Sequence, residues 1–232
     1  MKIVRKRWAC VLLLCGLLSM TACAPPRSNR ITIGAKNFTE QVVLGELLAQ
    51  EIEAVTKQRV ERRFYLAGSY LCHQALVSGR IDAYVEYTGT ALTAILKQPV
   101  DRDPERVRNT VSRLYNERFK IRAEPGLGFE DTFAMVVRGD DASRHGWHTL
   151  SDVRPDAAQM KLGVGYEFQS RPDGLPGLEA AYSLHFGDRP RVMDLGLLYR
   201  ALSAHQVDIV AGNSTDGPIR ALGFTVLADN LK

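Results

Sequence analysis

Strand-like and helix-like segments alternate along almost the whole chain after residue 30. Ile31–Ile33 is a short β-branched run, and the next segment carries apolar residues at helical spacing from Val42 to Val55. Val60–Leu66 then alternates polar and apolar residues, as a half-buried strand does. Because the alternation continues toward the C-terminal end, it predicts an α/β protein rather than an all-helical or all-β one.

The same pattern places the other elements and divides them into two blocks. The expected helices cover 69–76, 91–96, 103–119, 150–158, 172–184 and 195–204, and the expected strands cover 81–85, 132–138, 161–165, 191–193 and 207–211. Asn37 and Glu40 resemble a capping pair at the start of the first long helix. The loop at 124–130 predicts a boundary between lobe one (31–124) and lobe two (125–228), with a second crossing near 211–217. Two such lobes favour a ligand site between them.

Residues 1–22 have the pattern of a secretory signal peptide. A positively charged segment precedes the apolar run Val11–Leu18, which is too short to span a membrane. Thr21–Cys23 resembles a bacterial lipobox, which predicts lipidation of Cys23 and makes residues 23–30 a tether. The alternative is an ordinary signal peptide that is cleaved nearby. Either way, we expect an exported protein in the periplasm or at the outer face of the cell membrane.

The net positive charge of the chain belongs to this targeting segment. The sequence has 30 basic and 26 acidic residues, and its first 22 residues contain four basic residues and no acidic one. The exported part is therefore balanced, with 26 residues of each sign. No cluster of Lys and Arg remains to neutralise a phosphate backbone, so a nucleic-acid partner is not expected.

The cysteines predict neither a disulfide nor a catalytic centre. Of the four cysteines, Cys10 and Cys15 lie in the signal peptide and Cys23 is the predicted lipid site, so only Cys72 lies inside the fold. Cys72 is next to His73, but adjacent side chains rarely face each other as a nucleophile and a base must. The sequence has no phosphate loop and no metal-ligand spacing. We therefore expect no enzyme activity and no metal or other cofactor.

Residues 81–90 predict a strand that runs directly into the start of a helix. This junction brings together the ring of Tyr87, the hydroxyl of Thr90 and free backbone amides. A helix N-terminus favours anions, and the face of a tyrosine attracts a cation, above all a quaternary ammonium. A small zwitterion such as a betaine requires both contacts. From the pattern alone, Tyr87 could equally be a core aromatic residue and Thr90 a helix cap.

Four segments together resemble a known family. They are Lys36–Gln41, Glu86–Thr90, Arg171–Leu178 and Ser214–Gly217. These segments look like those of the substrate-binding proteins of glycine betaine/choline-type ABC importers. The resemblance implies a two-lobed periplasmic-binding-protein type II fold and a quaternary-amine ligand such as glycine betaine, choline, carnitine or ergothioneine. It also implies an ABC permease with its ATPase subunit as partners.

The resemblance also suggests which aromatic residues surround the ligand. Tyr87 matches a tyrosine of the aromatic cage, and Thr90 matches a position near the ligand. Phe133 stands where relatives often have a second cage tyrosine, and it keeps a face for a cation without the hydroxyl. Asn213 stands where relatives commonly have an aromatic residue, which weakens the predicted cage or indicates a different ligand.

Other candidate ligand contacts are polar, and each has an ordinary alternative. Gln41 near the start of a helix could bond a carboxylate or lie on the helix surface. Gly68 and Ser69 could offer amides to an anion or form a turn. Arg171 could pair with a carboxylate across the two lobes or form a structural ion pair.

The resemblance runs from Ile31 to about Asn230, whereas relatives normally continue for several tens of residues and return to lobe one. We therefore expect residues 229–232 to begin a truncated return. Two alternatives stay open: a truncated or degenerate lipoprotein without a ligand site, and a receptor for a different polar metabolite.

Overall fold

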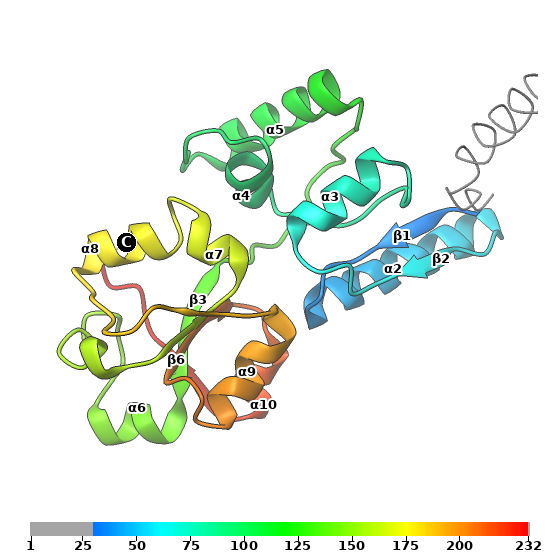
Figure 1. The fold of residues 1–232 in the computed structure, drawn as a ribbon. Helices are drawn as coiled ribbons and strands as arrows, with labels where there is room; N and C mark the ends of the chain where they lie inside the picture. The colour runs from blue at the N-terminus through cyan, green and yellow to red at the C-terminus, as the bar shows by residue number, and fades with distance from the viewer. Residues whose placement is uncertain (1–29, 232) are drawn as a thin grey trace, which may run out of the picture.

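The computed structural model describes residues 30–231, which fold into two α/β bodies (Figure 1). The predicted signal peptide, the predicted lipidation site Cys23 and most of the tether lie outside the described residues. Within the described residues, no helix is both long and apolar enough to cross a membrane.

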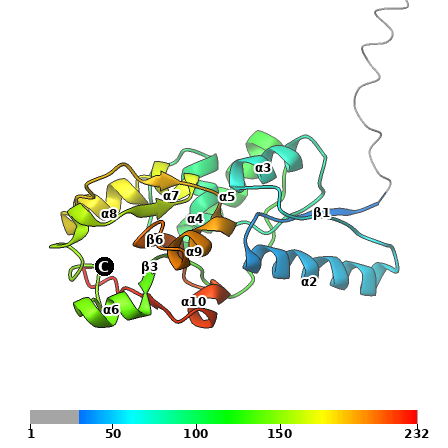
Figure 2. The ribbon, with the colours of Figure 1, turned by 60° about the horizontal axis from the view of Figure 1, so that its bottom comes forward.

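The first body contains a small parallel sheet that is covered by a long helix. Strand β1 (Thr32–Gly34) pairs in parallel with β2 (Glu61–Arg63), and α2 (Thr39–Thr56) connects them. Ile33 and Ala49 are fully buried between the sheet and the helix, where they form a core with Val60. Figures 1 and 2 show that this sheet and α2 extend away from the second body.

Three further helical segments and a π-helix complete the first body. They are α3 (Ser69–Val77), α4 (Thr88–Thr90), the π-helix η2 (Ala91–Ile95) and α5 (Pro104–Phe119). Asp103 caps α5, because its carboxylate accepts hydrogen bonds from two backbone amides of the first turn and Pro104 follows it directly. The inward face of α5 packs on η2 through Val107, Val111 and Leu114.

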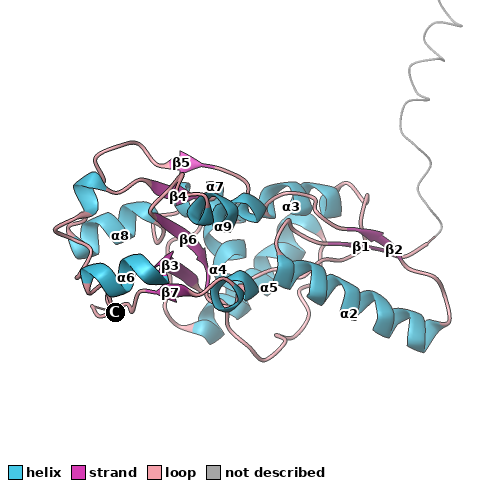
Figure 3. Cartoon of the chain, turned by 90° about the horizontal axis from the view of Figure 1, so that it is seen from below, coloured by secondary structure: helices cyan, strands magenta, loops and turns pink. Residues whose placement is uncertain are grey.

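A mixed five-stranded sheet forms the centre of the second body (Figure 3). Its order is β5-β4-β6-β3-β7, in which β3 is antiparallel to both neighbours and β4 is parallel to both of its own. The strands are β3 (Phe133–Arg138), β4 (Leu162–Val164), β5 (Arg191–Val192), β6 (Ile209–Asn213) and β7 (Phe224–Val226). The surrounding helices are α6 (Gly139–His145), η3 (Ala157–Gln159), α7 (Tyr166–Ser170), α8 (Leu175–Tyr182), α9 (Leu195–Ser203) and α10 (Gly217–Ala221).

Both faces of this sheet are buried. Met135 and Val137 of β3 belong to a core on one face, while Ala134 and Val136 belong to a separate core on the other. Successive side chains of a strand point to opposite faces, so a continuous apolar run such as 134–137 fits a strand that is covered on both sides.

Most predicted elements are confirmed, but two predicted elements and one predicted helix cap are wrong. The strand expected at 81–85 is reduced to one bridge between Ile33 and Ala83, and 150–158 forms turns rather than a helix. Asn37 and Glu40 do not cap α2, because Phe38 occupies the N-cap position without a side-chain bond. The Asn37 and Glu40 side chains bond Asp194 and Tyr87 instead.

The second crossing expected near 211–217 is also absent from the described residues. After β6 the chain continues through α10 into β7, which pairs with β3 of the same sheet, and Ala228 bridges to Thr149. Asp229 accepts a hydrogen bond from Tyr182 of α8. We keep 31–124 and 125–228 as the proposed bounds of the two lobes.

Candidate ligand-binding site

Tyr87 lies at the start of α4, where its hydroxyl contacts α2 and its ring lies beside residues that directly precede α2. The hydroxyl donates to a carboxylate oxygen of Glu40, and the amide nitrogen of Gln41 donates to the hydroxyl at 3.2 Å. The Phe38 ring lies 6.3 Å away at an interplanar angle of 23°. The ammonium of Lys36 lies 4.7 Å from the Tyr87 ring centre, so this ring already attracts a cation of the protein itself.

A buried ion pair holds the backbone of Tyr87 in place. Lys36 pairs with Glu86, and their side chains are only 4% and 13% exposed. The same Glu86 carboxylate accepts the backbone N–H of Tyr87 at 2.8 Å and the hydroxyl of Tyr84 at 3.0 Å. Burial and the charge of Glu86 raise the pKa of Tyr84. A buried charge is stable only when it is paired and hydrogen-bonded. The Glu86 carboxylate meets both conditions, because it pairs with Lys36 and accepts hydrogen bonds from Tyr87 and Tyr84.

The charge of Glu40, which accepts a hydrogen bond from the Tyr87 hydroxyl, also reaches two carboxylates of the second body. Burial raises the pKa of Asp131, and the nearby charge of Glu40 raises it further. Burial likewise raises the pKa of Asp216, and the charge of Glu40 adds a smaller upward shift. The carboxylate charges together create a negative potential, which favours the cationic end of a ligand.

Arg171 extends from lobe two to lobe one. Its guanidinium donates to the hydroxyl of Thr90 at 2.7 Å and forms a two-bond ion pair with Asp173 at 2.9 and 2.6 Å. The guanidinium carbon lies 4.8 Å from the centre of the Phe133 ring. The structure therefore brings together three predicted site residues, although the cation on Phe133 is Arg171 itself. Arg171 is 8% exposed, and its charge is compensated by Asp173.

A second contact between the lobes forms at the start of α3. The backbone N–H of Ser69 donates to a carboxylate oxygen of Glu167 at 2.8 Å. A Cβ atom at position 68 would collide with that carboxylate, so Gly68 leaves the space that Glu167 occupies. The Ser69 amide, for which the sequence suggested an anion contact, thus binds a carboxylate from lobe two.

Asn213 ends β6 directly opposite Phe133 of β3. Its backbone N–H donates to Asp216 at 2.9 Å, and the hydroxyl of Tyr199 donates to the same carboxylate oxygen at 2.7 Å. Asn213 therefore lies beside Phe133 but presents no aromatic face to a ligand.

Comparison with models of protein families identifies the family of this chain. The model of the substrate-binding domain of the ABC-type glycine betaine transport system matches residues 29–232. The chain belongs to this family.

Curated relatives agree with the assignment to this glycine betaine substrate-binding family. The carnitine transport binding protein OpuCC of Listeria monocytogenes is 32% identical over 96% of this chain and 74% of its own length. The ergothioneine transport permease/ergothioneine binding protein EgtU of Helicobacter pylori is 30% identical, over 86% of this chain and 36% of its own length.

A solved glycine betaine/carnitine/choline ABC transporter structure shares the fold. It is 31% identical, has a TM-score of 0.63, and is matched over 86% of this chain and 74% of its own. Apo YehZ from Escherichia coli follows with a TM-score of 0.53 and 25% identity. These neighbours confirm the predicted type II periplasmic-binding-protein fold.

Cys72 and His73, which the sequence did not favour as a catalytic pair, are both buried. Burial raises the pKa of the Cys72 thiol to about 12, so this thiol is not activated as a nucleophile. The His73 ring packs edge-on against Tyr115 and Phe119 of α5, at 5.6 and 4.6 Å between ring centres.

Several residues of the junction were missed by sequence reasoning. Lys36, Glu40 and Glu86 belong to the segments that resemble the family. Their position in these segments could have identified them as candidates, but it was not used. Glu167 gave no signal, because its importance comes from the approach of α7 to α3 and not from local sequence.

Proposed function

We propose that this chain is the extracytoplasmic substrate-binding component of an ABC importer, and that it captures a small quaternary-amine zwitterion. Family membership supports the role in import. The observation that carries the ligand class is the hydrogen bond from Arg171 of lobe two to the hydroxyl of Thr90 of lobe one, which stands three residues after Tyr87. One lobe supplies an aromatic face with carboxylates nearby, and the other supplies a cation for an anionic group.

In this proposal the cationic end of the ligand lies against lobe one, and the anionic end lies where Arg171 of lobe two meets lobe one. The methylated cation lies against Tyr87, where Glu40 and Asp131 add negative potential. The ligand carboxylate lies at Arg171 and Thr90, which can both donate to it. Phe133 supports the Arg171 guanidinium, and Gln41 and Asn213 line the remaining space. Binding at both ends draws the lobes together, and the contact of Glu167 with Ser69 helps to hold them.

The partners follow from the same role. A permease with its ATPase subunit receives the ligand from the closed form. The predicted export signal brings the chain to the outer side of the cytoplasmic membrane, and we propose that a lipid on Cys23 anchors it there. Ligand capture requires no chemical step, so we assign no catalytic residue.

Calorimetric titration with glycine betaine, choline, carnitine and ergothioneine tests this function. We expect saturable binding of at least one zwitterion. Absence of binding by all four amines, in a sample that unfolds cooperatively, would contradict the proposal.

The role of Arg171 is tested by a ligand that has no carboxylate. Arg171→Met should weaken carnitine or glycine betaine binding by about tenfold or more, because a charge-assisted bond is lost. Choline, which carries no carboxylate, should change by less than about threefold. Arg200→Met, which removes an exposed arginine of α9, serves as control. Equal losses for choline and the zwitterions would indicate a structural role for Arg171.

A further inference from the structure

We propose that one end of the small sheet in the first body is a docking surface for the anionic headgroups of phospholipids. This surface, the basic edge, consists of Arg30, Lys57, Arg59 and Arg80. The inference goes beyond ligand capture and rests on the proposed function in one respect, because the lipid on Cys23 brings the basic edge to a membrane. The edge then gives the anchored protein a second contact with the membrane surface.

Three arginines stand in the same register at this end of the sheet. Ile33 of β1 lies opposite Arg62 of β2 on one side and bridges to Ala83 on the other, and both pairings are parallel. Adjacent strands of a sheet lie about 4.8 Å apart, so equivalent positions on the three segments are neighbours in space. The positions three residues before this row are Arg30, Arg59 and Arg80.

Backbone hydrogen bonds hold the turns that carry these residues against the start of β1. The Glu61 N–H donates to the carbonyl of Ile31 at 2.8 Å. On the other side of β1, the Asp82 N–H donates to the carbonyl of Thr32 at 2.8 Å. Lys57, which follows the last residue of α2, adds a fourth cation to the turn before β2. The sheet thus gathers cations that are far apart in sequence and form no cluster there.

The cations of the basic edge are available to an external anion. All four residues are exposed. The Lys57 ammonium donates to a backbone carbonyl, that of Ala54, at 2.8 Å. Arg59 and Arg80 form no ion pair with any residue of the described range 30–231. The charge of Arg59 acts on Glu53 only from a greater distance.

The carboxylates nearest to the basic edge already have partners. Glu53 is bound by Arg62 at 2.7 Å, and Glu61 pairs with Arg63 at 2.8 Å. Asp82 accepts the backbone N–H of Thr32 at 2.8 Å. Cations that lie side by side repel one another, so an edge on which they outnumber the carboxylates favours an anionic partner.

The predicted anchor indicates which anionic partner meets the basic edge. Residues 23–30 connect Cys23 to the edge, and an extended chain of this length spans at most roughly 25 Å. The tether therefore keeps the edge close to the headgroups into which a lipid on Cys23 inserts. It also contains Arg27 and no acidic residue. Anionic headgroups attract lysine and arginine side chains near a bilayer, so a lipid surface fits both the charge and the place of the edge.

Binding to vesicles tests this surface without the anchor. Residues 23–232 with Cys23→Ser contain every described residue of the fold and cannot be lipidated. At low salt we expect this protein to sediment with phosphatidylglycerol vesicles and not with phosphatidylcholine vesicles, because the attraction is electrostatic. High salt should release it by screening the charges.

A triple variant assigns the binding to the basic edge. Lys57→Gln, Arg59→Gln and Arg80→Gln together should weaken binding to phosphatidylglycerol vesicles by about tenfold or more, because three attractive charges are lost. The matched control combines Arg154→Gln, Arg189→Gln and Arg200→Gln, which remove three exposed arginines of the second body and should leave binding nearly unchanged. Thermal unfolding shows whether each variant is folded. If the triple variant does not fold, Arg80→Gln alone should weaken binding by about threefold.

The outcomes separate this surface from the ligand site. Equal binding to both kinds of vesicle, or no binding to phosphatidylglycerol at low salt, overturns the proposal, and the second result would favour an acidic protein as partner. Equal weakening by the control substitutions also overturns it, because net charge and not the basic edge would then determine binding. Calorimetric titration of the folded triple variant should give the ligand affinity of the unmodified protein. Failure of the unmodified protein to bind any amine would contradict the proposed function and leave the vesicle result unaffected.

Discussion

Tyr87 shows at the scale of one residue how the junction is built. Its backbone is held by Glu86, its hydroxyl by Glu40 and Gln41, and its ring lies beside Lys36. Sequence reasoning could identify Tyr87 because it stands in a recognisable segment. It could not identify the partners of the hydroxyl, because they come from a helix 46 and 47 residues away in sequence.

His73 offers a residue-scale prediction about pH. Burial lowers its pKa from the ordinary 6.5, although the charge of Glu86 opposes the shift. The folded state therefore keeps His73 neutral while the unfolded chain takes up a proton below about pH 6.5. Its contribution to stability is complete above that pH and is lost as the pH falls. Between about pH 7 and pH 5, the free energy of unfolding should therefore decrease less in His73→Phe than in the unmodified protein.

Chemical denaturation at a series of pH values measures this decrease. His185→Phe, which removes an exposed histidine, is the matched control and should follow the unmodified protein. A pH dependence in His73→Phe that equals that of the unmodified protein would refute the assignment.

Helix α2 shows at the scale of an element what periodicity can and cannot predict. The apolar spacing located the helix, yet its buried positions are Gln41, Gly45 and Ala49. Small residues are buried because the helix packs closely: a Cβ atom on Gly45 would lie 2.9 Å from Phe64. The apolar side chains that remain exposed are Val43, Leu47 and Val55. Leu48 and Ile52 pack against the core, so hydrophobicity alone predicted only part of the buried face.

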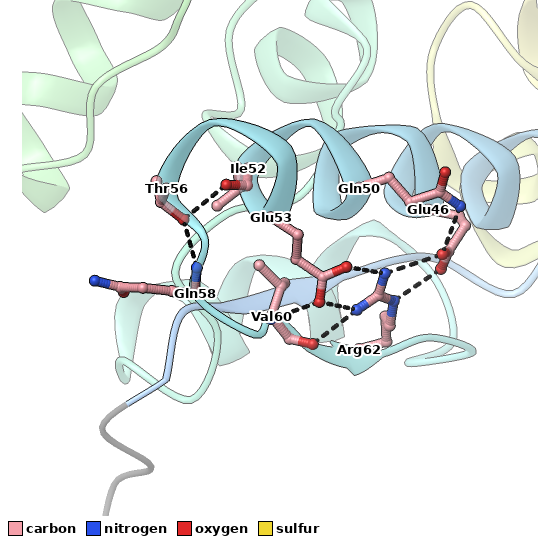
Figure 4. Close-up of polar contacts among 8 residues, drawn as sticks. All are labelled: Glu46, Gln50, Ile52, Glu53, Thr56, Gln58, Val60 and Arg62. Atoms are coloured by element: carbon pink, nitrogen blue, oxygen red, sulfur yellow. Dashed lines mark hydrogen bonds and ion pairs between the residues drawn. The ribbon is translucent and has the colours of Figure 1, made fainter.

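Arg62 joins α2 to β2, as Figure 4 shows. Its guanidinium donates to both Glu46 and Glu53 of the helix and to the carbonyl of Val60, at 2.7 to 3.0 Å. The hydrogen bond from Arg62, followed by that from the Val60 N–H, lowers the pKa of Glu53 to about 2. Stability from this group is present above about pH 4.5 and is lost as the pH falls toward 2.

We expect Arg62→Met to lower the thermal midpoint of unfolding by roughly 2–4 °C at neutral pH, since the network is partly exposed. It should also reduce the loss of stability between about pH 4.5 and pH 2. Differential scanning calorimetry measures both effects. Arg63→Met is the neighbouring control, because Arg63 pairs with Glu61 on the same strand. An unchanged midpoint and acid profile would show that the network is not stabilising.

At the scale of the whole molecule, the two lobes meet through side chains that no local pattern joins. The bonds are Asn37 to Asp194, Ser69 to Glu167 and Arg171 to Thr90. The alternating elements and the loop at 124–130 predicted two α/β bodies. They could not predict that β7 stays with the second body, because strand pairing depends on contacts far apart in sequence.

The Glu167 contact predicts a conformational effect on binding. Glu167→Ala removes the acceptor for the Ser69 N–H without altering Tyr87 or Arg171, so the closed arrangement becomes less populated. We expect ligand affinity to fall by about threefold to tenfold and the radius of gyration without ligand to increase. Gln169→Ala on the same helix is the control. Unchanged affinity together with an unchanged radius would exclude a role in closure.

The central claim is that a quaternary amine binds between the lobes at Tyr87. Calorimetric titration of Tyr87→Ala against Tyr70→Ala tests it most directly, because Tyr70 is a tyrosine of α3 that is 65% exposed. With the best-bound amine, Tyr87→Ala should weaken binding by at least about tenfold through loss of the cation–π contact, while Tyr70→Ala binds like the unmodified protein. Unaltered affinity in folded Tyr87→Ala would contradict the account.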